Sequence, residues 1–499
     1  MLRRKIITDT LFLNAGSLVS QVLVFLQGLI VLKMLEPRTY GVWVAVNVVL
    51  RYGTLAQAGL ENGMAIRLPY HRGRGDTARV ELIAGTSFVL WTLIAAAAAA
   101  AVALFATFSN RFQGVERYGL FVVALLILLE QQLSFLTRWE TAVHMNFRRP
   151  ALMGVLRQSV TFAFVVPLTW KFGLRGLMTG VLAAWVVTWA VYLRRSNFAP
   201  RFAFSKDAAT ETFRNGFPLF VTAIGGTVIE TIDRALVGSL LGAVALGYYG
   251  LTTLGGNALF GLLRQAGGAL SPHIVAEMGR SRDDLRALDR FLRPPTIVFA
   301  YAGAALMSAL MIGVPTLVRA YLPKYIPGID AFYWYVPGFF FLGIILTANN
   351  ILNLHLIATE QRRIAIFIQL AAIAVEAGGA VLLIRLGLGI AGVAMASTAS
   401  YVFYGCFVLW WAARFVIPER RIRLAFFGAV ALPFFYALAG AWIVSTASVA
   451  VAGNHVGRLL AAQVLFGILL WLPPMWLLNR RYAIAEVIGR KRRPAVVKA

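Results

Sequence analysis

The sequence is poor in the residues from which catalytic and metal centres are usually built. It has a single cysteine, Cys406, and five histidines in 499 residues. One cysteine excludes a disulfide framework and a cysteine metal site. Charged residues make up only 14% of the chain, and 47 lysines and arginines outnumber 21 acidic residues. Soluble domains have about 25% charged residues, so an ordinary water-soluble fold is excluded.

Motifs for nucleotide hydrolysis and for metal-dependent sugar transfer are also absent. No G-x-x-x-x-G-K-[ST] loop occurs, so direct ATP hydrolysis is not expected. The longest expected loops, 195–213 and 272–291, carry no acidic metal motif. We therefore expect no catalytic residue, no cofactor and no metal, and a membrane glycosyltransferase or polymerase is disfavoured.

Long apolar segments are what the sequence has in excess. Hydrophobic residues make up 59% of it, and the mean hydropathy is +0.74. Helices of about 20 apolar residues cross a hydrocarbon core of about 30 Å. We predict an all-α polytopic membrane protein of about fourteen spans, with the phospholipid bilayer as a partner. The spans are expected at 10–34, 41–66, 81–108, 118–144, 151–170, 175–193, 214–241, 245–271, 292–318, 331–357, 364–384, 388–413, 424–446 and 458–479.

The net charge of +26 lies in short basic clusters between these segments. Nucleic-acid binding would need one basic stripe, so no nucleic-acid partner is expected. Most of the lysines and arginines between spans fall on the side of the N-terminus, which predicts that both termini are cytoplasmic. Arg282–Leu292 is interpreted as a short amphipathic surface helix, with a solvated loop as the alternative. The basic tail at Arg490–Arg493 is interpreted as a topology determinant that touches anionic lipid.

The two halves of the sequence repeat short motifs in the same order. The matched pairs are Pro37–Gly41 with Leu246–Gly250, Gly73–Arg74 with Gly279–Arg280, Arg148–Arg149 with Arg362–Arg363, and Gly173–Gly176 with Gly389–Gly392. Each unit has six spans, so both halves enter the membrane in the same orientation. We predict two pseudo-symmetric six-helix lobes around a central cavity, at 1–200 and 201–415. Residues 416–499 add two spans and the basic tail.

At these motifs the chain resembles the polysaccharide (O-antigen type) flippases of the multidrug, oligosaccharidyl-lipid and polysaccharide exporter superfamily. The matching residues are Leu35–Gly41, Gly59–Gly63, Asp233–Gly242 and Leu246–Gly250. The resemblance implies a bacterial inner membrane protein that carries a polyprenyl-diphosphate-linked glycan from the inner to the outer leaflet by alternating access. It also allows other polysaccharide assembly proteins as partners. Fourteen spans, with Arg51 and Arg264 on the second and eighth, likewise resemble the peptidoglycan lipid II flippase.

Basic side chains inside the expected spans indicate the cargo. Each arginine at the centre of a membrane costs about 2.5–3.5 kcal/mol, so such residues face a wet cavity, pair with acids or lie near a surface. Arg51 with Asn47, Arg138 with Glu130, Arg264 with Asn257, and Arg234 with Glu230 each fall on one helical face. Our hypothesis is that Arg51 and Arg264 grip a diphosphate, that Arg138 attracts it from the inner side, and that Asn257 and Asn350 meet sugars. Arg234 is the fourth arginine that we predict to bind the cargo.

Structural interpretations stay open at these positions. Glu230, Asp233 and Arg234 are spaced to neutralise one another within a helix. Arg138 and Arg264 lie near enough to a surface to snorkel, and the asparagines could join helices.

Uphill transport needs an energy source, and buried acids could bind a proton or a sodium ion. The candidates are Glu61, Glu130, Asp233 and Glu376. A multidrug or cation antiporter of the same superfamily is the alternative function, although four arginines favour an anionic cargo.

Overall fold

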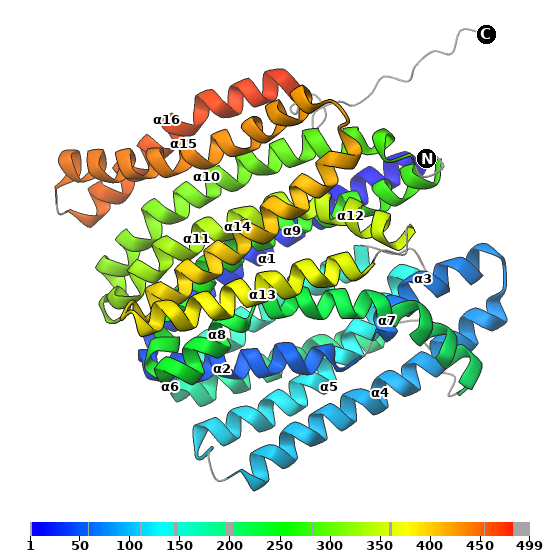
Figure 1. The fold of residues 1–499 in the computed structure, drawn as a ribbon. Coiled ribbons are helices and arrows are strands. Elements are labelled where there is room, and N and C mark those ends of the chain that lie inside the picture. The colour runs from blue at the N-terminus through cyan, green and yellow to red at the C-terminus, as the bar shows by residue number, and fades with distance from the viewer. Residues whose placement is uncertain are drawn as a thin grey trace.

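The structure is a computed structural model, and it describes residues 2–57, 59–109, 112–143, 148–195, 203–280, 284–358, 362–453 and 455–482. These residues form an all-α bundle of long helices, and no strand occurs among them. The helices run roughly parallel or antiparallel to one another along the length of the molecule (Figure 1). The end of the bundle where α1 begins is called the N-terminal side below, and the other end the opposite side.

The first half of the chain contains six rods; the second is interrupted, and the last two are joined directly at Gly173. Its elements are α1 (Leu2–Met34), α2 (Pro37–Thr54), the 3₁₀ turn η1 (Leu55–Gln57), α3 (Leu60–Gly73), α4 (Thr77–Phe108), α5 (Val115–Ala142) and α6 (Arg148–Arg195). Pro37 starts α2 because its fixed φ suits the first helical turn. Gly59, with φ 90°, separates α2 from α3 within the expected span 41–66.

The second half follows the same plan with more breaks. Its elements are α7 (Lys206–Ile229), α8 (Ile232–Leu236), the π-helical η2 (Val237–Leu241), α9 (Gly242–Arg280), η3 (Leu285–Leu288), α10 (Asp289–Tyr321), η4 (Pro323–Gly328), α11 (Ile329–Ile344), α12 (Leu346–Ala358), α13 (Arg362–Arg385) and α14 (Gly389–Val416). Gly173 inside α6 and Gly389 at the start of α14 have φ 59° and 51°. These two glycines are a predicted repeat pair, so the pseudo-symmetry extends to backbone conformation.

Two further helices lie outside the repeat. α15 (Arg420–Ala452) and α16 (Val456–Tyr482) pack against each other and against α10, at one edge of the bundle (Figure 1). Trp471 Nε1 donates to Ser308 Oγ at 2.7 Å, which fixes α16 on α10. The outward side chains of the pair, such as Trp442 and Leu432, are exposed apolar groups suited to lipid.

The chain is a multi-pass membrane protein. Among the described residues nine helices are long and apolar enough to cross a membrane, and a bent pair, Pro323–Ile344 with Leu346–Leu352, makes a tenth. α6 counts once there although Gly173 divides it into two helices. The remaining expected spans correspond to α1, to α2 with α3, and to α7, which are more polar or interrupted. Together these account for the prediction of about fourteen spans.

One expectation on the N-terminal side is wrong. Arg282–Leu292 is not a separate surface helix, because the described part is the 3₁₀ turn η3, which continues directly into α10. Leu288 and Leu292 are fully buried while Arg286 and Arg290 are exposed, so the described part has one face against the bundle and one face outward. Residues 281–283 and the basic tail 490–493 lie outside the described residues.

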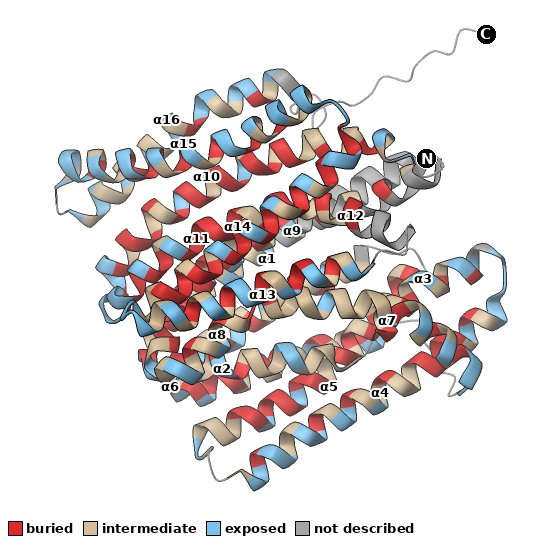
Figure 2. Cartoon of the chain, in the orientation of Figure 1, coloured by how far each residue is buried: buried red, intermediate tan, exposed pale blue. Residues whose placement is uncertain are grey.

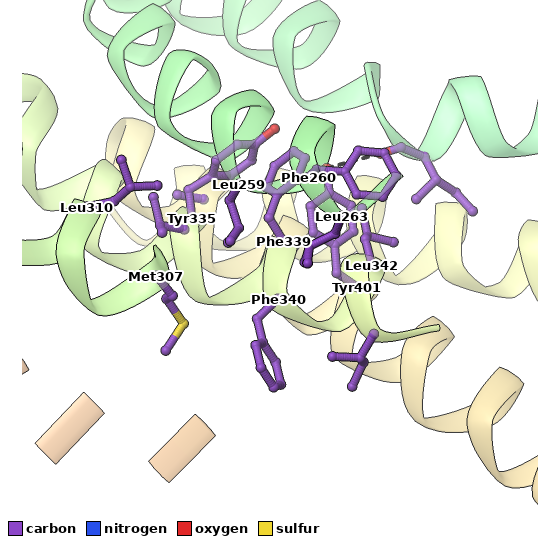
Figure 3. Packing of buried hydrophobic residues seen from close by; sticks show 14 of the residues in the cluster. Leu259, Phe260, Leu263, Met307, Leu310, Tyr335, Phe339, Phe340, Leu342 and Tyr401 are labelled. Atoms are coloured by element: carbon purple, nitrogen blue, oxygen red, sulfur yellow. Dashed lines mark hydrogen bonds between the residues drawn. The ribbon is translucent and has the colours of Figure 1, made fainter. Parts of the chain in front are cut away.

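The larger buried core lies where the two halves meet and within the second half, and a smaller one lies within the first half (Figure 2). α9 packs against α1 and α2, and α7 packs against α3. Figure 3 shows the aromatic part of this core, in which the Phe339 ring lies 5.3 Å from Tyr401 and 4.9 Å from Tyr335. This packed layer surrounds the polar groups described next.

Candidate functional site

A cavity of about 250 Å³ lies between the two halves, with α1 and α2 on one side and α8 and α9 on the other. Its polar lining consists mainly of Asn47 and Arg51 from α2, Arg234 from α8, and Thr253 and Asn257 from α9. The predicted polar faces of the second and eighth spans therefore point into one chamber, which is called the central chamber below. Two arginines from opposite halves meet in it.

Arg264 lies beside the central chamber without being part of its wall. Its Nη1 is 3.7 Å from Glu230 Oε2, and its side chain is 56% exposed. The charges that act on Arg51 are those of Glu230, Arg264, Glu130 and Arg234. The basic residues thus form one electrostatic group, and Glu230 pairs with Arg264 instead of with Arg234.

A second cavity, of about 340 Å³, lies within the first half and is called the N-half cavity. It is lined by Glu61, Glu130, Arg138, Arg157 and Trp185, among others. Arg138 forms an ion pair with Glu61, and the Arg157 guanidinium lies over the Trp185 ring at 4.6 Å. Two acids and two bases balance each other here, so this cavity is polar without the positive excess of the central chamber.

Asp233 is fully buried at the centre of the second half. Its Oδ2 accepts hydrogen bonds from the hydroxyls of Tyr249 at 3.0 Å and Tyr335 at 2.5 Å, and its Oδ1 accepts from the Arg234 backbone N–H at 2.7 Å. The Arg234 Nε lies 3.9 Å from the same Oδ1. Hydrogen bonds to the carboxylate are the means by which a buried charge is tolerated.

Glu376 on α13 is also fully buried, but neither of its carboxylate oxygens has a hydrogen-bond partner. The charge of Asp233 acts on it, and the hydroxyls of Ser397 and Ser400 lie beside it. Those hydroxyls donate to backbone carbonyls of α14 and α13. An acid buried without a partner is costly unless it is neutral or binds a cation, so Glu376 and Asp233 form a candidate ion site.

The two halves are in direct backbone contact on the opposite side of the bundle. A Cβ on Gly41 would lie 1.8 Å from the carbonyl oxygen of Ala243, and a Cβ on Gly247 would lie 1.8 Å from that of Pro37. Only glycine permits this approach. The repeat motifs Pro37–Gly41 and Leu246–Gly250 therefore close the seam between α2 and α9.

On the N-terminal side the seam between α3 and α7 is closed in a similar way. A Cβ on Gly216 of α7 would lie 2.0 Å from the carbonyl oxygen of Gly59, and a Cβ on Gly63 would lie 2.2 Å from that of Thr212. The motif Gly59–Gly63 thus serves as a close contact between halves.

An ion cluster reinforces this contact at the surface. Glu211 of α7 accepts hydrogen bonds from Arg67 and His71 of α3 and from Arg79 of α4, the last two at 3.0 and 2.5 Å. Glu211 precedes the expected span 214–241. Burial raises the pKa of the Glu211 carboxyl, but the hydrogen bonds from His71, Arg79 and Arg67 outweigh burial and lower the pKa to about 2. One carboxylate therefore ties the second half to two helices of the first.

The candidate residues thus divide into groups. Arg51, Arg234 and Asn257 share the central chamber, Arg264 lies beside it, Arg138, Glu61 and Glu130 line the N-half cavity, and Asp233 and Glu376 are buried in the second half. Asn350 lies on α12 and lines neither cavity.

Some site residues fall outside the predicted set. Arg157 has the same sequence signal as the others, a charge inside the expected span 151–170, but the set leaves it out. The tyrosines Tyr249 and Tyr335 around Asp233 have no such signal, because they resemble ordinary core residues. The cluster around Glu211 joins helices far apart in the chain, so only the tertiary structure brings it together.

Comparisons with known proteins agree with this geometry. The family model described as "Polysaccharide biosynthesis protein" matches residues 30–324, more than half of the chain. No curated protein matches the sequence.

Among solved structures, the fold resembles the lipid II flippase MurJ in an inward closed conformation, with TM-score 0.68, 14% identity, and coverage of 95% of this chain and 100% of that one. It also resembles an inward-facing multidrug resistance MATE family transporter of the MOP superfamily, with TM-score 0.63, 15% identity, and coverage of 79% and 94%. A MOP superfamily transporter from Pyrococcus furiosus, whose binding pocket is described as reversed in polarity, gives TM-score 0.56, 14% identity, and coverage of 84% and 96%.

Proposed function

This chain belongs to the polysaccharide biosynthesis protein family, and we propose that it is a flippase for a polyprenyl-diphosphate-linked oligosaccharide. The observation that carries the proposal is the convergence of Arg51 and Arg234, from opposite halves, on the central chamber. The cargo moves from the inner to the outer leaflet, and both termini are cytoplasmic in a bacterial inner membrane. Residues 1–200 and 201–415 act as the two lobes, and 416–499 are an addition outside them.

The chemistry of the chamber suits a diphosphate. Guanidinium groups bind phosphate oxygens through charge-assisted and often bidentate hydrogen bonds. Arg51 and Arg234 line the chamber, and Arg264 lies close enough for its charge to act on Arg51. A cargo with two phosphates neutralises this group of charges, whereas a cationic drug is repelled by it.

The sugars of the cargo would meet the neutral polar groups of the same chamber. Asn47 and Asn257 line it from opposite halves, and amides donate to and accept from sugar hydroxyls. Asn350 is not part of this lining, so we assign it no sugar contact.

Alternating access follows from two closures on one seam. Gly41 with Gly247 seals the opposite side, and Glu211 with its basic partners seals the N-terminal side. Opening one closure while the other holds exposes the chamber to one leaflet at a time. The N-terminal closure depends on charged groups, which water can solvate when they separate.

Asp233 and Glu376 are the pair we assign to ion coupling. Both are fully buried, their charges act on each other, and Asp233 adjoins Arg234 of the chamber. A cation or proton bound between them changes the charge next to Arg234 and so couples to the cargo. Glu61 is paired with Arg138, and Glu130 faces Arg157, so neither is preferred.

A lipid II flippase is the second candidate, because the fold of MurJ covers 95% of this chain. Its substrate is also a polyprenyl-diphosphate-linked glycan, and the same arginine chemistry serves both. A multidrug antiporter is disfavoured by the positive central chamber.

Transport in reconstituted vesicles tests the proposal. Arg51→Ala and Arg264→Ala are expected to reduce transfer of a fluorescent undecaprenyl-diphosphate disaccharide at least tenfold. Arg385→Ala, at an exposed position on α13, is the control and should leave the rate unchanged. Full transfer by both variants would refute the proposed role of these arginines, and efflux of ethidium by the wild type would favour the antiporter.

A further inference from the structure

An apolar crevice of about 530 Å³ lies along α2 on the face away from the central chamber. Both halves of the protein form its walls: α2, α4 and the start of α5 from the first, and α8, η2 and α9 from the second. The lining includes Ala45 and Val49 of α2, Ala101 and Phe105 of α4, and Gly238 of η2. Few of its lining residues are polar, so it does not suit a sugar.

The crevice is open to the surface that lipid covers. Ala45, Ala101 and Ser239 are exposed, and Phe105 is 56% exposed, although all four line the cavity. An apolar chain can therefore enter it sideways from the bilayer.

The crevice and the central chamber share two lining residues, Val48 of α2 and Arg234 of α8. α2 touches the second half on either side of this point. Gly41 contacts Ala243 toward one end, and the Tyr52 hydroxyl is 2.9 Å from Thr231 Oγ1 toward the other. Between these contacts Val48 and Arg234 border both the polar space and the apolar one.

We propose that the crevice binds the polyprenyl chain of the cargo while the diphosphate lies in the central chamber. This inference rests on the proposed function and adds a second subsite to it. The guanidinium of Arg234 stands where the charged head must join the apolar tail. Its Nε is buried, without a hydrogen-bond partner, 3.9 Å from Asp233 Oδ1, so this edge of the guanidinium faces the Asp233 carboxylate.

The π-helical η2 supplies the room for the chain. π-helical turns are frequent at functional sites. A Cβ on Gly238 would meet only Leu246 Cδ2, at 3.1 Å, so a glycine is not required there for packing against backbone. Because Gly238 has no side chain, it does not project into the crevice that it lines.

Photo-crosslinking locates the chain directly. Ala100 and Ala101 are adjacent exposed alanines of α4, but only Ala101 lines the crevice. Benzoyl-phenylalanine placed at 101 is expected to label radioactive undecaprenyl diphosphate in nanodiscs, and the same group at 100 is expected to label it at least tenfold less. Equal labelling at both positions, or labelling of phospholipid alone at 101, overturns the proposal.

Chain-length dependence gives an independent measurement. Ala101→Trp is expected to weaken binding of undecaprenyl diphosphate about tenfold and to leave binding of geranyl diphosphate, which has only two isoprene units, unchanged. Ala100→Trp serves as the matched control for folding and should bind both as the wild type does. If both lipids bind with equal strength to the two variants, the subsite is wrong while the flippase proposal stands. If the wild type binds neither diphosphate, the proposed function fails as well.

Discussion

Gly41 and Gly247 lie in the matching turn motifs of the two halves and approach each other closely in the fold. A Cβ on Gly41 would lie 2.9 Å from the backbone nitrogen of Gly247, in addition to its clash with Ala243. The turn motif of one repeat is therefore the surface against which the turn motif of the other repeat closes. A substitution at either position acts on both halves at once.

Gly247→Ala should open the closure on the opposite side, because its methyl group would meet the Pro37 carbonyl. We expect a cysteine introduced at Val48, in a Cys406→Ser background, to react about tenfold faster with an impermeant maleimide, which is a shift of about 1.4 kcal/mol. Gly428→Ala is the control, since nothing lies within 4 Å of a Cβ there. An unchanged rate in Gly247→Ala would show that the contact does not control access.

Glu211 predicts how the N-terminal closure responds to pH. A carboxyl whose pKa is lowered stabilises the closed state above its unpaired value of about 4.3 and ceases to do so as the pH falls toward its lowered pKa. That pKa is about 2. Spin labels on α3 and α7 should therefore report no loss of the closed population between pH 7 and pH 5.

Glu211→Gln should raise the open population at both pH values. Hydrogen bonds to charged groups contribute about 1.5–3 kcal/mol, and partial exposure places this cluster toward the lower end. Asp207→Asn, one turn earlier on α7, is the control. If the closed population does not change in Glu211→Gln, the glycine contacts alone hold this side closed.

The sequence predicts the spans well and their interruptions poorly. The spans can be predicted from runs of apolar residues, because a helix that crosses the hydrocarbon core must be mostly apolar along its length. The break at Gly59 and the π-helical η2 depend on what each helix meets in the other half. Arg51 and Arg234 could be placed on polar faces from spacing alone, but Asn350 could not be separated from Asn257, because a helical face does not reveal which cavity it lines.

The two buried acids should differ when neutralised. Asp233→Asn removes an acceptor for the hydroxyls of Tyr249 and Tyr335, so it should lower stability by about 1–3 kcal/mol. Glu376→Gln breaks no hydrogen bond and removes a buried charge, so its thermal unfolding temperature should not fall.

Glu376→Gln should also abolish the response of vesicle transport to imposed sodium or proton gradients. Glu277→Gln, near the end of α9, is the control and should retain the response. Wild-type transport that ignores both gradients would reject ion coupling, and a gradient response that persists in Glu376→Gln would move the ion site elsewhere.

Gln131 of α5 is a structural rather than a transport residue. It accepts a hydrogen bond from Trp91 Nε1 and donates one to the Thr54 carbonyl at 2.6 Å, at the end of α2. Gln131→Leu leaves both partners unsatisfied and should cost about 1–3 kcal/mol each in unfolding free energy. The neighbouring Gln132→Leu, which loses only a partly buried bond to Thr92, should cost less. Equal losses in denaturation would contradict this assignment.

The interruption between α2 and α3 bears on how the protein moves. The contact at Gly41 on the opposite side belongs to α2, and the contacts at Gly59 and Gly63 belong to the break and to α3. Since η1 and Gly59 divide the rod, we expect α2 to be able to move away from α9 while α3 stays in contact with α7, and the reverse. The α2–α3 rod is thus hinged, and we expect that one closure can open without a tilt of the whole lobe.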